Sequence, residues 1–192
     1  MWTCIAADWR FGIGDPTPAG WFATLAYGLA ALAAAAVALR GRAIGRERLA
    51  WSLAAVALAL LAANKQLDLQ TLLRGLGRCA TAGTRLEGVR YGIKEAVVIA
   101  LPLLGLAGLT AAWLTLRGTL ARTWPIVAGF GLVAAFVVVR AAWLADVYIP
   151  IGAQLGYAGL DWLLEFPGPL LILLAALVAL RNPPGTGRGT SA

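Results

Sequence analysis

Five long apolar runs, separated by short polar joints, constrain this chain more than any other feature. A helix that crosses a bilayer needs about 20 mostly apolar residues to cover a hydrocarbon core of roughly 30 Å. Hydrophobic residues make up 60% of the 192 positions, 13% are charged, and the mean hydropathy is +0.79. A typical soluble domain carries about 25% charged residues. We therefore predict an all-α, polytopic transmembrane helical bundle.

The apolar runs predict five spans, at about residues 21–39, 49–64, 96–116, 124–146 and 161–181. We expect residues 1–182 to form a single transmembrane domain. Residues 183–192 are rich in glycine and proline, which predicts a flexible tail. The N-terminal segment lacks a basic stretch followed by an apolar one, so we expect no cleaved signal peptide.

Charges in the joints predict the orientation, because short loops rich in Lys and Arg stay in the cytoplasm. Eight basic residues fall on the side of the C-terminus and seven on the other side, which is nearly a tie. Eight of the nine acidic residues fall on the side with seven basic ones. We therefore expect the N-terminus outside and the C-terminus and its tail in the cytoplasm.

The joint between the second and third spans carries a helical pattern. Leucines recur at i, i+3, i+4 and i+7 from Leu69 to Leu76, and polar side chains follow at four-residue steps from Gln70 to Arg78. This pattern favours an amphipathic helix lying in the outer interface. In the alternative, the second span continues straight out of the membrane to Gly75 and pairs with the returning chain as a helical hairpin.

Cys4 and Cys79 are the only two cysteines, and both fall on the predicted outer side, where disulfides persist. A disulfide between them would tie the N-terminal segment to the second joint, and two unrelated buried thiols are the alternative. The chain has no histidine and no CxxC pair. These absences exclude histidine-based catalytic sites and the common zinc sites, so we predict no metal site and no required cofactor.

Arg140 and Glu165 lie inside predicted spans, where an ionised side chain is costly unless it is paired. Both fall near the outer ends of the fourth and fifth spans, so we expect an ion pair that clamps these spans together. The functional alternative is a site for an anionic headgroup. The segment Phe166–Pro169 must break the fifth helix, and broken helices often mark binding sites inside membranes.

Further polar residues are predicted to converge on the same outer half. The ligand or ion-pair candidates are Asp15, Asn64, Lys65, Asp68, Arg90, Glu95, Arg140, Asp146 and Glu165. The inner half holds only arginine-rich joints between apolar runs. We therefore expect any functional site to face outward.

The string NKQLDLQ at residues 64–70, together with residues 13–17 and Gly20-Trp21, resembles an uncharacterised family of bacterial multi-span inner-membrane proteins. The resemblance extends over most of the chain and implies a multi-pass protein of the bacterial inner (cytoplasmic) membrane. Relatives carry histidines shortly after the position of Arg140, where this chain has Ala145-Asp146. The resemblance therefore implies no histidine-dependent role here, and it brings no activity with it.

Three functions compete. We favour a non-catalytic component that binds membrane lipids, a partner membrane protein or a second copy through small-residue faces such as Gly129, Gly131 and Ala134. One alternative is a membrane enzyme acting on a lipid-linked or phosphorylated substrate, with outer carboxylates as acid, base or Mg²⁺ ligands. The other is a small transporter or channel. The basic residues form no aromatic-laced patch, so nucleic acid is not an expected partner.

Overall fold

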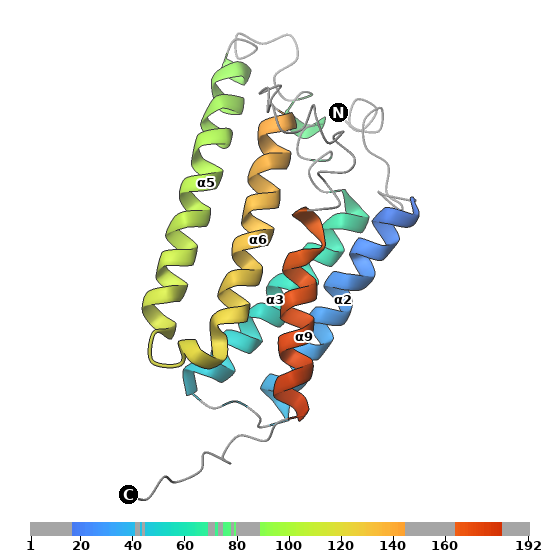
Figure 1. Ribbon diagram of the computed structural model, residues 1–192. Helices are drawn as coiled ribbons and strands as arrows, with labels where there is room; N and C mark the ends of the chain where they lie inside the picture. The colour runs from blue at the N-terminus through green and yellow to red at the C-terminus, as the bar shows by residue number, and fades with distance from the viewer. Residues whose placement is uncertain are drawn as a thin grey trace, which may run out of the picture.

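The computed structural model describes residues 17–40, 43, 45–68, 72, 75–77, 79, 89–144 and 164–181, and every regular element in these ranges is an α-helix. The principal helices are α2 (Pro18–Leu39), α3 (Gly45–Leu67), α5 (Val89–Leu116), α6 (Leu120–Leu144) and α9 (Pro167–Arg181). They lie side by side as a bundle (Figure 1). The predicted all-helical class is therefore confirmed for the described residues.

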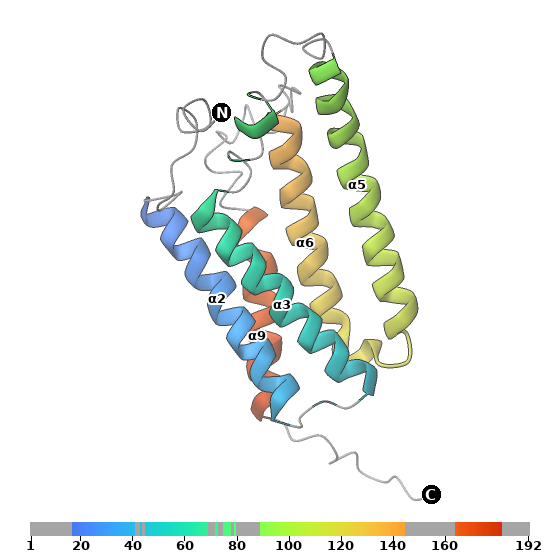
Figure 2. The ribbon, with the colours of Figure 1, turned by 180° about the vertical axis from the view of Figure 1, so that it is seen from behind.

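The helices of the bundle do not contact one another equally. α2 packs chiefly against α3 and α9, and α6 packs against α9 and α5. α3 makes far fewer contacts with α5 and α6. The hairpin of α5 and α6 also extends past the first turn of α2 at one end of the bundle (Figures 1 and 2). α5 is therefore a peripheral helix, held mainly by α6.

α2 turns alanines inward and leucines outward. Ala30 and Ala34 are fully buried, whereas Leu29 and Leu32 are 53% and 70% exposed. On α3, Leu49, Leu53 and Leu60 also face outward, but Trp51 and Leu58 are buried beside the alanines. In water, such a contiguous apolar surface would be a liability. In lipid, small residues let helix backbones approach closely while large apolar side chains meet acyl chains, so the pattern is that of a membrane bundle.

Three helices of the described residues are long and apolar enough to cross a membrane, namely α2, α3 and the Leu120–Val139 part of α6. α9 is a shorter apolar helix, Pro167–Arg181. In α5, the stretch Pro102–Leu116 is the one whose side chains the structure describes without a gap, and the apolar run itself begins at Ala96. At 1.5 Å per residue, α9 is about 22 Å long, less than the roughly 30 Å of a hydrocarbon core. Length and composition therefore identify three candidate spans.

α3 ends where Asp68 takes a left-handed conformation, with a φ of 45°. The Asp68 N–H still donates to the carbonyl of Asn64, at 3.0 Å, but a left-handed residue does not continue a helix. The alternative in which α3 runs on to Gly75 is therefore wrong. Most of residues 69–78 lie outside the described residues, so the amphipathic interfacial helix stays a prediction.

The fifth predicted span is broken next to its prolines. Leu164 and Glu165 are helical, Phe166 forms a turn, and α9 begins at Pro167. A proline suits the first helical turn, because its missing N–H would have no partner there. The predicted start of this span at 161 lies outside the described residues. The break places Glu165 immediately before the N-terminus of α9.

Gly129 of α6 and Gly168 of α9 bring these helices into close contact. A Cβ at Gly129 would lie 2.5 Å from Cγ1 of Ile172, and a Cβ at Gly168 would lie 2.7 Å from the Gly129 carbonyl oxygen. By contrast, a Cβ at Gly131 would meet Leu109 only at an ordinary 3.9 Å. The small residue at 129 therefore serves packing within the chain.

Candidate functional site

An ion pair with a buried carboxylate joins the last turn of α3 to the segment before α9. The Nζ of Lys65 lies 2.8 Å from Oε1 of Glu165, and the two side chains are 21% and 9% exposed. Removing one member of such a pair leaves an uncompensated charge in a poorly solvated place. The pair therefore fixes the approach to α9 against α3, although the two segments are far apart in the sequence.

Polar side chains of α2 extend this connection. The Nε2 of Gln66 donates a hydrogen bond to Oγ1 of Thr24 at 2.8 Å, and this hydroxyl donates to the carbonyl of Gly20 at 2.9 Å. Tyr27, also on α2, is buried and 4% exposed. Among the described residues, the buried Oε1 of Gln66 has no hydrogen-bond partner. α2, α3 and the start of α9 thus share one polar cluster.

The structure brings part of the predicted candidate set together. Asn64, Lys65 and Asp68 lie at the end of α3, and Glu165 meets this end through Lys65. Candidates whose side chains lie outside the described part of the chain are Asp15, Arg90, Glu95, Arg140 and Asp146. The predicted pair of Arg140 with Glu165 therefore stays a prediction, and the partner found for Glu165 is Lys65.

Cys79 is disulfide-bonded. Cys4, the only other cysteine of the chain, lies outside the described residues. The pairing of the two cysteines therefore stays a prediction.

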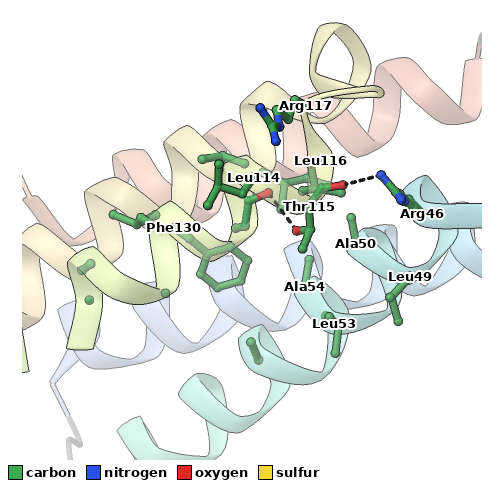
Figure 3. A pocket seen from close by; sticks show the side chains of 18 of the residues that line it. Arg46, Leu49, Ala50, Leu53, Ala54, Leu114, Thr115, Leu116, Arg117 and Phe130 are labelled. Carbon is green, nitrogen blue, oxygen red and sulfur yellow. Dashed lines mark hydrogen bonds between the residues drawn. The ribbon is translucent and has the colours of Figure 1, made fainter. Parts of the chain in front are cut away.

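A large groove lies at the other end of the bundle, between α3, α5 and α6. Its volume is about 1230 Å³. One wall comes from Leu49 and Leu53 of α3, the opposite wall from the last turns of α5, and Phe130 of α6 lies between them (Figure 3). The body of the groove is apolar, and it occupies the half that we expected to be a plain bundle.

The groove exists because small residues line the helices that bound it. Ala54 on α3 and Gly105 and Gly108 on α5 carry little or no side chain into the space. A Cβ added at Gly108 would meet nothing within 4 Å. Since α3 also packs only weakly on α5 and α6, none of the described helices fills the gap. Sequence reasoning missed this site, because its only signal is the absence of bulky residues.

Two arginines stand at one end of the groove. The Nη1 of Arg46 donates to the carbonyl of Thr115 at 3.4 Å, and Arg117 lies on the turn that follows α5 (Figure 3). Among the described residues, Arg117 makes no hydrogen bond or ion pair. The adjacent buried carboxylate, Glu47, faces Arg122 at 3.7 Å. The apolar groove therefore ends at two guanidinium groups that lack a carboxylate partner in the described part of the chain.

The described residues contain no group of three or more acidic or cysteine side chains placed to hold a metal ion. No protein-family model, curated protein or solved structure matches this chain.

Proposed function

We propose that this chain is a non-catalytic, lipid-binding component of the bacterial inner membrane, with five membrane-embedded helices and its N-terminus outside. The groove between α3, α5 and α6 is the observation that carries this proposal. In it the acyl part of a lipid lies against the small residues of α5. The polar cluster at Lys65 and Glu165 holds the bundle together in the outer leaflet.

The arrangement of the joints supports the proposed topology. The end of α2, the start of α3, the turn between α5 and α6 and the end of α9 all lie at one end of the bundle (Figure 1). Arginines stand at each of these points, at Arg40, Arg46, Arg117 and Arg181. Because basic residues in short joints favour the cytoplasm, this end faces inward in the proposal.

The size and the lining of the groove support a lipid rather than a small polar ligand. Pockets for small molecules usually span about 300–1000 Å³, below the volume of about 1230 Å³ here. Leu53 and Leu104 on its rim are exposed, so its side faces the surrounding bilayer. A long, flexible apolar ligand can therefore enter from the membrane without crossing a polar barrier.

The two buried carboxylates of the described residues favour a structural role for the acidic groups. Glu165 is paired with Lys65, and Glu47 faces Arg122. An enzyme that uses carboxylates as acid, base or Mg²⁺ ligands would need two of them close together. Each of these two instead meets a cation, which supports the non-catalytic proposal over the enzyme alternative.

Filling the groove tests the proposal. Gly108→Phe places a ring in the open space of the groove, whereas Gly28→Phe places the same ring on α2, where a Cβ also meets nothing within 4 Å. We expect lipid retained through detergent purification, measured by native mass spectrometry, to fall about tenfold in Gly108→Phe, as a clash of 1–3 kcal/mol predicts. Gly28→Phe should retain as much lipid as the unsubstituted chain.

Two results would count against lipid binding in the groove. In the first, the unsubstituted chain carries no lipid after mild purification. In the second, Gly108→Phe and Gly28→Phe retain the same amount.

A further inference from the structure

We infer that the groove selects phospholipids with a net anionic headgroup, whose phosphate lies between Arg46 and Arg117. This inference rests on the proposed function, because it names the class of lipid that the same groove takes. It differs from the predicted outward-facing site, since the two arginines lie at the arginine-rich end of the bundle.

Like a phospholipid, the groove is apolar along its body and charged at one end. Its body is lined by side chains such as Leu49, Leu53 and Phe130. At one end Arg46 meets Thr115, and Arg117 also lines this end (Figure 3). That end coincides with the start of α3 and the turn after α5, where the chain leaves the membrane in the proposed topology. A lipid in the groove would therefore place its chains along α3 and its headgroup at the level of these arginines.

Both guanidinium groups are available to an anion. Arg46 reaches only a backbone carbonyl, at the long distance of 3.4 Å, and Arg117 is exposed and makes no polar contact in the described ranges. The one acidic residue in the joints of this end is Glu47, which faces Arg122 instead. The mouth of the groove therefore carries a positive charge that no carboxylate of the described residues neutralises.

Guanidinium groups suit a phosphate diester better than a neutral ligand. Arginine donates two parallel hydrogen bonds to phosphate oxygens, and it remains charged at any physiological pH. Zwitterionic lipids also contain a phosphate, but their own cation cancels its charge. Each basic residue near an anionic membrane surface contributes roughly a fivefold preference, so the two arginines together predict a preference of at least about tenfold.

The test compares two lipids with identical acyl chains, phosphatidylglycerol and phosphatidylcholine, competing for the full chain in detergent. The variant Arg46→Gln/Arg117→Gln removes both charges at the groove. The matched control, Arg48→Gln/Arg181→Gln, removes the same number of charges from exposed positions outside the groove lining. Native mass spectrometry counts the bound lipid of each kind.

We expect the unsubstituted chain and the control to bind phosphatidylglycerol at least about tenfold better. The groove variant should bind both lipids equally, with its phosphatidylcholine binding unchanged, which also shows that the groove is still folded. Equal binding of both lipids by the unsubstituted chain would overturn the anionic selection alone. The anionic selection would also be overturned if the groove variant still preferred phosphatidylglycerol. A chain that binds neither lipid would overturn the proposed function as well.

Discussion

At the scale of single residues, the pair of Lys65 and Glu165 is the clearest case in which a charge inside an apolar run is explained by its partner. Glu165 is 7% exposed, and Lys65 is the partner found for it among the described residues. An ion pair in a membrane interior gains little over apolar packing, but half of a pair is strongly unfavourable. The two residues therefore matter as a unit.

Lys65→Met should lower the free energy of unfolding in detergent by about 3 kcal/mol, because it leaves the carboxylate of Glu165 buried and unpaired. The double variant Lys65→Met/Glu165→Leu should recover most of this loss, since apolar side chains of similar size suit the same place. Thermal unfolding followed by circular dichroism measures both. Equal stability of Lys65→Met and the unsubstituted chain would show that the pair does not hold α3 to the start of α9.

Sequence reasoning identified Lys65 and Glu165 as candidates, because charged residues inside apolar runs stand out. It did not pair them, because the pairing depends on which helices are neighbours in space. Gln66, Thr24 and Tyr27 were missed for the same reason. A single hydroxyl or amide inside a span gives no signal until the opposite helix is known.

At the scale of helices, close packing depends on where side chains are missing. The contact of α6 with α9 needs glycine at both Gly129 and Gly168, and the buried face of α2 is built of alanines. The missing side chain at Gly108 has the opposite effect, because a Cβ there would meet nothing within 4 Å. The same residue type therefore closes one interface and opens another.

Gly129→Ala should destabilise the bundle by about 1–3 kcal/mol, because its Cβ would lie 2.5 Å from Ile172 and the backbones would have to separate. Gly131→Ala, two positions along the same helix, provides the matched control, because its Cβ has room. Unfolding temperatures of the two variants in the same detergent compare them directly. If the two variants have the same unfolding temperature, the glycine contact does not determine the packing of α6 on α9.

Hydropathy predicted the existence of the helices well and their ends less well. α5 begins at Val89 rather than at 96, because a helix continues through Arg90 and other polar residues that hydropathy assigns to the joint. α3 ends at Leu67 because Asp68 takes a left-handed conformation. The apolar run before it does not predict that conformation. Hydropathy marks the part of a helix that lipid can cover, and capping and backbone geometry decide where the helix ends.

At the scale of the whole molecule, the two ends of the bundle differ in a way that composition alone did not predict. We expected the outer half to hold any site and the arginine-rich half to be plain. The described residues place a buried polar cluster at the end of the bundle that holds Lys65, and an apolar groove with two available arginines at the arginine-rich end. The groove forms because α3, α5 and α6 leave space between them. It therefore could not be predicted from any one segment of the sequence.

We propose that α2, α3 and α5 each cross the membrane, so that the start of α2 and the turn after α5 lie on opposite sides. Single cysteines at the exposed positions Pro18 and Gly118 test it in intact cells with a membrane-impermeant maleimide, with the unsubstituted chain as the background control. We predict that Pro18→Cys is labelled at once and Gly118→Cys only after the membrane is permeabilised. Labelling of both cysteines in intact cells would contradict the claim.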